Sequence, residues 1–149
     1  MKSKYNVKMI SENFGKYKYN EIEKYVELGG FIGLKVALEK GKQYVIDELK
    51  ISGLRGRGGA AFPTWQKWKG GLNELDEETF VICNADEGEP ATFKDRELLL
   101  QDPYKIIEGL IVSGYMRSAK TGAIYLREEY TYMKYKLELA LELSRKNGY

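Results

Sequence analysis

Apolar residues recur at intervals of three and four along much of the chain, a pattern that predicts amphipathic helices. The first helix is expected to start at the N-cap Asn20, with Glu23 as its capping-box partner, and to stop at the glycine pair 29–30. Gly41 and Gly53 are expected to end the next two helices. The further helical patterns cover residues 31–40, 43–53, 103–115 and 132–146.

Two short apolar runs, residues 80–83 and 123–126, predict strands of the kind buried in a parallel sheet. Between them, Asp102 as N-cap and Pro103 as the first helical residue start the helix of a right-handed crossover. The expected fold class is α/β, in which N-terminal helices and a glycine-rich loop precede a parallel β-α-β-α unit. Because two strands make a small sheet, we expect either the opening of a larger α/β domain or a domain that borrows strands from a partner.

The 149 residues are 43% hydrophobic and 31% charged, which is typical of a globular domain. We expect residues 1–19 to form an N-terminal arm and residues 20–149 to form one α/β domain. The sequence contains no apolar run as long as a membrane span and no signal peptide, so a cytoplasmic location is expected. The formal net charge of +2, with both signs interspersed, gives no indication of nucleic-acid binding.

The chain has one cysteine, Cys83, and no histidine. This composition excludes a disulfide framework, the usual zinc sites, an iron–sulfur cluster held by this chain alone, and Cys–His or Ser–His–Asp catalysis. Chemistry must therefore depend on a bound cofactor or on carboxylates and lysines, and no metal site is expected. Cys83 lies inside an apolar run and is interpreted as a buried hydrophobic residue.

A glycine-rich segment follows the third expected helix. Residues 53–59 contain four glycines, interleaved with Arg55 and Arg57. Glycine disfavours helices and strands, but it permits positive φ and lets a ligand approach the main chain, whose N–H groups can hold phosphate or ring oxygens. The segment is neither a dinucleotide fingerprint, which follows a strand, nor a Walker loop, because Trp68 and not Ser or Thr follows Lys67.

An acidic segment follows the first expected strand, where open α/β sheets bind their ligands. Its polar residues are Asn84, Asp86, Glu87 and Glu89. Taken alone, a glycine-rich loop is more often a turn, and an acidic loop is more often a solvated surface. The two segments together, at this spacing, favour a site. Trp65 and Trp68 are interpreted as packing residues, and Lys94 and Arg96 as partners of carboxylates.

The two segments, SGLRGRGGAAFPTWQKW and VICNADEGEPATFKDRELLLQDPYKIIEGLIVSGY, resemble the flavoprotein subunit of respiratory complex I. This NuoF or 51 kDa family is shared with NAD-linked hydrogenases and formate dehydrogenases. The resemblance implies an NADH dehydrogenase in which noncovalently bound FMN accepts a hydride from NADH and passes electrons singly to iron–sulfur clusters. That chemistry belongs to the flavin, and the protein supplies position and electrostatics.

The resemblance also implies roles for residues of the glycine-rich segment. Lys67 resembles the lysine that contacts the flavin, and Phe62 resembles an aromatic residue on the NADH side. The family usually has glycine where Ala61 stands. The loop that wraps FMN is matched by Gly56, Arg57, Gly58 and Gly59.

In the acidic segment, Asn84, Asp86 and Glu87 correspond to residues hydrogen-bonded around the flavin ring and ribityl chain. Glu89 resembles the carboxylate near the nicotinamide and is the candidate catalytic residue. The implied cofactors are FMN and NAD, with no iron–sulfur cluster within this chain.

The resemblance covers about the first third of the family's subunit, so the expected domain is an incomplete FMN- and NADH-binding domain. The implied partners are iron–sulfur subunits of an NADH dehydrogenase or hydrogenase-type complex and a separate chain that completes the flavin site. Such a complex would place the chain at the cytoplasmic face of the membrane. Two other functions stay open, a flavin-free binding or assembly module and an inactive fragment of such a subunit.

Overall fold

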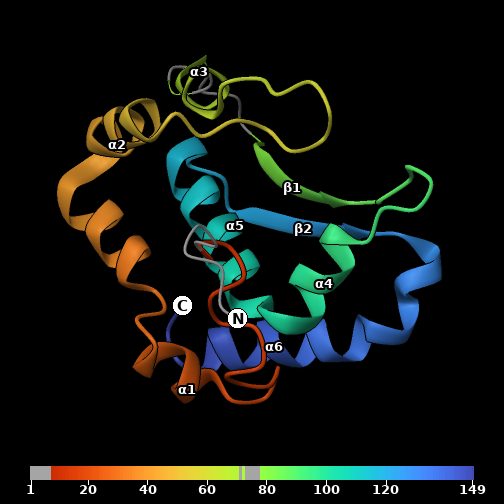
Figure 1. Cartoon of the computed structure of the whole chain (residues 1–149). Coiled ribbons are helices and arrows are strands. Elements are labelled where there is room, and N and C mark those ends of the chain that lie inside the picture. Colours follow the sequence, from red (N-terminus) through yellow and green to blue (C-terminus); the bar gives the residue numbers. More distant parts are fainter. Residues whose placement is uncertain (1–7, 71, 73–77) are drawn as a thin grey trace, which may run out of the picture. The chain divides into compact units, whose positions relative to one another are not determined.

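A computed structural model describes residues 8–70, 72 and 78–149 and shows an α/β protein (Figure 1). In chain order the elements are α1 (Ile22–Glu27), α2 (Ile32–Ser52), α3 (Thr64–Gly70), β1 (Phe80–Ala85), α4 (Lys94–Gln101), α5 (Pro103–Arg117), β2 (Thr121–Leu126), the 3-10 helix η1 (Glu128–Met133) and α6 (Lys134–Lys146). β1 and β2 form a two-stranded parallel sheet. The fold class predicted from the sequence is confirmed.

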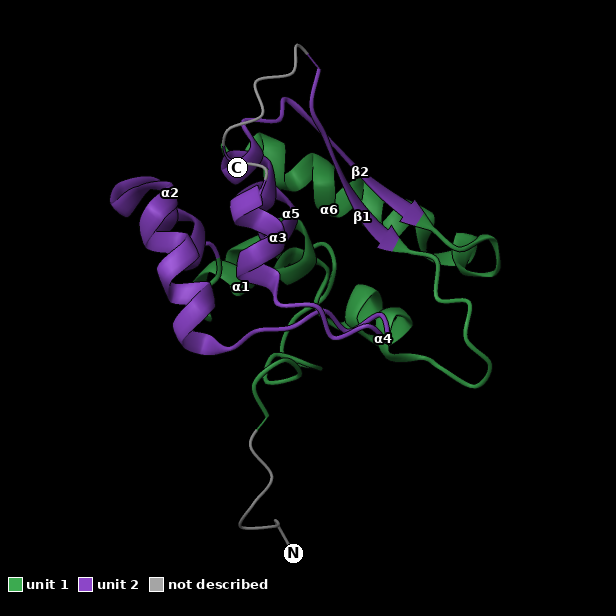
Figure 2. Ribbon diagram, turned by 90° about the horizontal axis from the view of Figure 1, so that it is seen from above, with its two compact units in different colours: residues 1–30, 85–107, 126–149 green, residues 31–84, 108–125 purple. Residues whose placement is uncertain are grey.

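The chain divides into two compact units, which Figure 2 shows in different colours. The first unit contains the segment up to Gly30 together with residues Ala85–Ile107 and Leu126–Tyr149. The second unit contains residues Phe31–Asn84 and Glu108–Tyr125. Each unit therefore combines segments that are far apart in the sequence.

Three tyrosine rings lie at the centre of the first unit's core. The ring of Tyr17 lies 5.4 Å from that of Tyr25 and 5.7 Å from that of Tyr104, centroid to centroid. The rings of Tyr25 and Tyr104 are 5.5 Å apart. Tyr17 belongs to the expected N-terminal arm, so part of that segment packs into the core. Residues 1–7 lie outside the described part of the chain.

In the second unit, α2 is interrupted at Gly41, whose φ of 86° and ψ of 172° are not helical. Only glycine adopts such angles readily. The helix ends at Gly53, which has a left-handed φ of 64°. Both glycine stops predicted from the sequence are confirmed. The start of α2 is tied to Glu108 of α5, which accepts hydrogen bonds from the N–H of Phe31 over 2.8 Å and of Leu34 over 3.1 Å.

The sheet has one covered face and one open face. A Cβ atom added at Gly122 would lie 3.4 Å from side-chain atoms of Leu110, so this face of β2 lies against α5. Side chains alternate along a strand, and residues of the other phase are exposed: Phe80 by 54%, Ile82 by 65% and Tyr125 by 62%. The prediction of buried strands is therefore wrong in the described residues, because a helix covers only one face of the pair.

Other local expectations also differ from the structure. α1 starts after Glu21 and has no side-chain cap, so the capping box predicted at Asn20 is wrong. Instead, the Glu21 carboxylate accepts a hydrogen bond from the N–H of Lys18 over 2.7 Å. The sequence pattern also missed α3 and α4, which span only 7 and 8 residues and are too short to show a clear apolar period.

Candidate functional site

The glycine-rich loop of the second unit is a closed turn between α2 and α3. An antiparallel bridge joins Arg55 to Pro63 at its base. The N–H of Gly56 donates a hydrogen bond to the carbonyl of Phe62 over 2.9 Å. Residues 57–61 therefore form a tip whose base is held by main-chain hydrogen bonds.

The glycines at the tip face open space. A Cβ atom added at Gly58 or Gly59 would meet no atom of the described chain within 4 Å beyond its own sequence neighbours. The φ of 103° at Gly59 requires glycine, whereas no positive φ imposes glycine at Gly58. Ala61 has a φ of 49°, a left-handed conformation in which glycine is less strained. An open tip of this kind fits a ligand that lies against the main chain.

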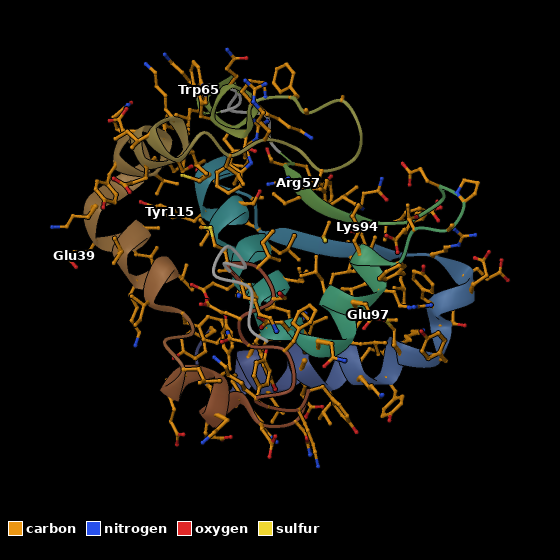
Figure 3. The ribbon with its side chains drawn as sticks, viewed as in Figure 1. Glu39, Arg57, Trp65, Lys94, Glu97 and Tyr115 are labelled. Carbon is orange, nitrogen blue, oxygen red and sulfur yellow. The ribbon has the colours of Figure 1, made fainter. Side chains whose placement is uncertain are left out.

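Three candidate side chains on the loop and on the helix that follows it are exposed: Arg57, Phe62 and Lys67. Lys67 lies on α3, which packs on α2 (Figure 3). At this contact the Lys50 ammonium lies 5.4 Å from the ring centre of Trp65, in agreement with a packing role for the tryptophan. The loop and α3 together therefore expose two candidate cations and one aromatic ring.

The acidic segment begins at the carboxyl end of β1. Asn84 is the last residue of this strand in the second unit, and Asp86, Glu87 and Glu89 belong to the first unit. Asn84, Asp86 and Glu89 are exposed, whereas Glu87 is only 2% exposed. The exposed side chains can accept hydrogen bonds from a ligand, but Glu87 faces the protein.

Protein donors surround the Glu87 carboxylate. The N–H of Asp95 donates to Oε1 over 3.1 Å, and the N–H of Arg96 and the hydroxyl of Tyr130 donate to Oε2 over 3.4 and 3.0 Å. The Lys94 ammonium lies 3.7 Å from Oε1. Burial raises the pKa of Glu87, but the three hydrogen bonds and the lysine charge outweigh it and lower the pKa below its ordinary value. An ionised carboxylate therefore binds the first turn of α4.

Lys94 and Arg96 pair with carboxylates, as the sequence predicts. The Lys94 ammonium lies 2.9 Å from Asp95, and the Arg96 guanidinium lies 3.2 Å from Glu97. Lys94 and Glu97 both belong to α4, and Figure 3 labels them there. Both cations therefore lie beside carboxylates of their own chain.

Arg127, the residue after β2, donates hydrogen bonds to main-chain carbonyls at the start of the acidic segment. Its Nη1 donates to the carbonyl of Glu87, and its N–H donates to the carbonyl of Ala85 over 3.2 Å. Its Nε and Nη2 donate to the two carboxylate oxygens of Glu129 over 2.8 and 2.6 Å. This pairing raises the pKa of Arg127 and lowers the pKa of Glu129 to about 2.

Sequence reasoning identified neither Arg127 nor Tyr130 as a residue of the site. Tyr130 is only 9% exposed, and its hydroxyl is bonded to Glu87. Both residues follow β2, and the carboxyl ends of parallel strands share one edge of a sheet. Polar residues after the second strand were therefore the available signal.

The structure brings the candidates together in two groups. The second unit holds the glycine tip, Phe62 and Lys67 on one loop and the helix that follows it. The first unit holds Asp86, Glu87 and Glu89 within one short segment. That both groups face one cleft stays a prediction.

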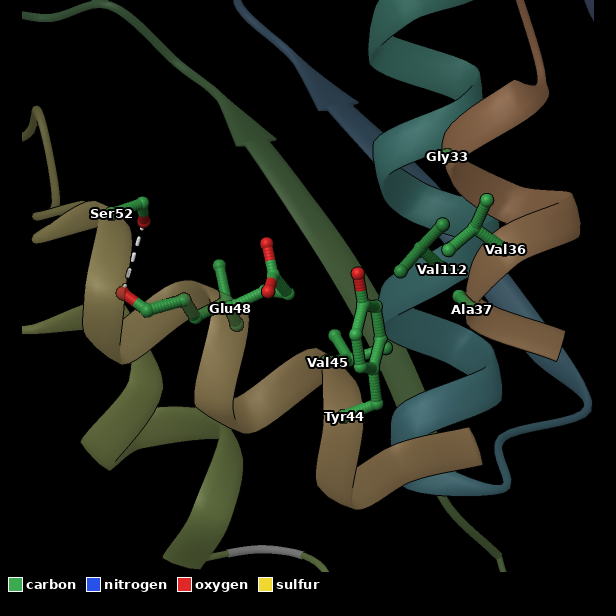
Figure 4. Close-up of a pocket in the computed structure, with 9 residues that line it drawn as sticks. Gly33, Val36, Ala37, Tyr44, Val45, Glu48, Ser52 and Val112 are labelled. Atoms are coloured by element: carbon green, nitrogen blue, oxygen red, sulfur yellow. Dashed lines mark hydrogen bonds between the residues drawn. The ribbon is translucent and has the colours of Figure 1, made fainter. Parts of the chain in front are cut away.

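A pocket of about 400 Å³ lies elsewhere in the second unit, along α2 and beside Val112 of α5 (Figure 4). Its lining is mostly apolar and includes none of the predicted site residues. The hydroxyl of Ser52, one of the lining residues, donates to the carbonyl of Leu49 over 3.0 Å. The lining consists of Gly33, Val36, Ala37, Tyr44, Val45, Glu48, Leu49, Ser52 and Val112.

Within the residues that the structure describes, no group of three or more His, Cys, Asp or Glu side chains could hold a metal ion. Cys83 is half-buried, so it is less enclosed than the sequence predicts. In residues 8–70, 72 and 78–149, every helix is too short or too polar to span a lipid bilayer.

Comparison with known proteins connects these features to one family. The family model of the Nuo51 FMN-binding domain matches residues 49–148, which include both the glycine loop and the acidic segment. A subunit of the NADH-quinone oxidoreductase of Aquifex aeolicus is 42% identical over 141 residues, which are 95% of this chain and 33% of the relative. The alpha subunit of the NAD-reducing hydrogenase HoxS of Cupriavidus necator is 46% identical over 106 residues, which are 71% of this chain and 18% of the relative.

A solved structure gives the same result. The crystal structure of an NAD+-reducing NiFe hydrogenase in the air-oxidized state matches with a TM-score of 0.65 and 45% sequence identity, over 69% of this chain and 18% of that chain. This chain spans a third or less of the length of these relatives. The resemblance seen in the sequence is confirmed, and the chain belongs to the Nuo51 FMN-binding domain family.

Proposed function

We propose that this chain supplies part of an FMN site in the flavoprotein of an NADH dehydrogenase. The observation that carries the proposal is the open glycine tip. Gly58 is exposed, has no positive φ and would place an added Cβ in open space. The fold therefore gives no reason for glycine there, whereas a flat ligand lying on the main chain does.

The residues on the loop fit the chemistry of FMN. When bound, FMN supplies a hydride acceptor that releases electrons singly. The main-chain N–H groups of residues 57–59 would hold its oxygens. The exposed ammonium of Lys67 would stabilise negative charge on a phosphate or on a reduced ring. The ring of Phe62 would line the side of the flavin site that NADH approaches.

The acidic segment would supply the complementary hydrogen bonds. Asn84 and Asp86 are exposed and would bind the ring N–H and the ribityl hydroxyls. Glu89 is exposed as well and would face the nicotinamide, where its carboxylate would orient the dinucleotide. NAD in its reduced form is therefore the proposed substrate.

The relatives support a role within a larger complex, because they are named as subunits of oxidoreductases and hydrogenases. We place the iron–sulfur clusters and the remainder of the flavin site on other segments or chains of such a complex. The described residues contain a single thiol, Cys83, so they cannot build a four-thiolate cluster. The cytoplasmic location stays a prediction.

Flavin binding by the full chain tests the proposal, with Gly58→Val as the decisive variant. The added side chain should leave thermal unfolding unchanged, because the fold has room for it, and should reduce FMN retention at least about tenfold. Gly109→Ala is the matched control, because Gly109 lies on α5 with no neighbour around an added Cβ. It should keep FMN binding.

Equal FMN binding by wild type and Gly58→Val would refute the role of the tip. A wild-type chain that stays colourless with saturating FMN, yet binds a partner, would support the flavin-free binding or assembly module. A chain that binds neither would support an inactive fragment.

Two further variants separate the proposed roles. Lys67→Ala should weaken FMN binding more than Lys69→Ala, its exposed neighbour on α3. Glu89→Gln should alter NADH kinetics more than flavin content. The reverse pattern for Glu89 would assign this carboxylate to the flavin.

A further inference from the structure

We infer that Arg127 and Tyr130 are positioning residues for the proposed site, and that Glu87 belongs with them as a clamp and is not a ligand. The clamp is defined as Glu87, Arg127 and Tyr130, all within the first unit. The clamp fixes the main chain around Asp86 and Glu89, and so the positions from which their carboxylates would bind a ligand. The inference rests on the proposed function, since those two carboxylates are its ligand-facing residues.

The main chain of the acidic segment is tied down at three points. The N–H of Arg127 binds the carbonyl of Ala85, and its guanidinium binds the carbonyl of Glu87. The hydroxyl of Thr92 donates to the carbonyl of Glu89 over 2.7 Å. The side chains of Asp86 and Glu89 are exposed between these ties, so their direction depends on the ties.

The carboxylate of Glu87 is already occupied. It accepts three hydrogen bonds from the protein, lies beside the Lys94 ammonium and is 2% exposed. A carboxylate offers about four acceptor positions, so most of its capacity is used. A flavin atom would have to reach the one remaining acceptor position of a side chain that is only 2% exposed.

Arg127 is suited to its role because Glu129 orients it. The bidentate pair fixes the plane of the guanidinium and leaves Nη1 to bind the carbonyl of Glu87. A lysine at this position would lack the planar fork that reaches both oxygens of Glu129 and the carbonyl of Glu87. Arg127→Lys therefore tests geometry while it conserves the charge.

Tyr130→Phe is the sharpest variant, because it removes one hydroxyl and keeps the ring. Tyr132→Phe is the matched control. Tyr132 is 55% exposed, and its ring lies 6.5 Å from that of Tyr130. Amide hydrogen exchange in residues 86–92 of the full chain without flavin should become about three- to tenfold faster in Tyr130→Phe. It should not change in Tyr132→Phe.

Flavin binding is the second readout. With FMN added, Tyr130→Phe, Arg127→Lys and Glu87→Gln should each bind about three- to tenfold more weakly. The visible absorption spectrum of the bound flavin should shift, and exchange in residues 86–92 should rise in parallel. Tyr132→Phe should match wild type in all three measurements.

The outcomes separate this inference from the proposed function. Weaker FMN binding with unchanged amide exchange would show direct contact with the flavin and would overturn the clamp. Unchanged exchange and unchanged FMN binding would overturn it as well. If the wild-type chain binds no FMN, the proposed function fails, and the exchange of residues 86–92 still decides whether the clamp exists.

Discussion

The hydroxyl of Tyr17 donates a hydrogen bond to Oδ1 of Asp102, a residue 85 positions away in the sequence. Both side chains are buried, with 7% and 0% exposed. Burial raises the pKa of Tyr17, and the hydrogen bond to Asp102 raises it further, so the phenol stays protonated. Lys105 lies 3.1 Å from Oδ2 of the same carboxylate. The contact joins the segment before α1 to the start of α5.

Tyr17→Phe should lower the free energy of unfolding by about 1–3 kcal/mol, because it leaves a buried carboxylate oxygen without its phenol donor. Urea denaturation followed by far-ultraviolet circular dichroism measures the change. Tyr132→Phe removes an exposed hydroxyl and should leave the midpoint unchanged. Equal midpoints for wild type and Tyr17→Phe would show that this hydrogen bond adds no net stability.

Gly41→Ala should lower the free energy of unfolding by about 1–3 kcal/mol, because the angles that interrupt α2 at this position are strained for any residue with a Cβ atom. Thermal unfolding measures the effect. Gly109→Ala provides the contrast, since the same change inside the regular helix α5 should stabilise the protein by about 1 kcal/mol. Stabilisation by both variants would mean that α2 becomes straight when alanine replaces Gly41.

Stability should fall on acidification, because the pKa of Glu87 is lowered and the pKa of Glu129 falls from 4.5 to about 2. Between these values the unfolded chain binds more protons than the folded chain, so the stabilisation is present above pH 4.5 and is lost as the pH falls toward about 2. Across this range the midpoint of thermal unfolding should change less steeply with pH for Glu87→Gln than for wild type. The same pH dependence in both proteins would show that Glu87 does not contribute to the loss of stability at low pH.

The open face of the sheet should tolerate polar residues. Ile82→Thr, at a side chain that is 65% exposed, should change the free energy of unfolding by less than about 0.5 kcal/mol. It should also reduce association of the chain at high concentration, as measured by sedimentation velocity. Val81→Thr is the matched control in the opposite phase of β1, and it should destabilise the protein by about 1–3 kcal/mol. An equal loss of unfolding free energy in Ile82→Thr and Val81→Thr would show that both faces of the sheet are covered.

Local signals predicted much of the fold. The stops at Gly41 and Gly53 and the start at Pro103 follow from backbone angles that a single residue imposes, and both strands follow from short apolar runs. Burial was not predictable in the same way. Whether Phe80 and Ile82 are covered depends on what packs on the sheet, and an apolar run carries no information about that.

The candidate site shows the same division. The glycine tip is recognisable in the sequence, because its residues are contiguous and its backbone requirement is local. The role of Glu87 is not, since its donors include Tyr130, 43 positions away, and the adjacent residues are exposed carboxylates of identical chemistry. Arg127 acts on a main-chain carbonyl 40 positions away, a partner that no side-chain pattern reveals.

The chain passes from one unit to the other four times, at Gly30–Phe31, Asn84–Ala85, Ile107–Glu108 and Tyr125–Leu126. During synthesis, the second unit has all of its residues once Tyr125 has left the ribosome. The first unit must wait for α6, so Tyr19, whose ring lies 5.8 Å from that of Tyr135 on α6, stays without this partner until that helix has been translated. A stop codon placed before α6 would therefore leave the second unit with all of its segments and the first unit without its last helix.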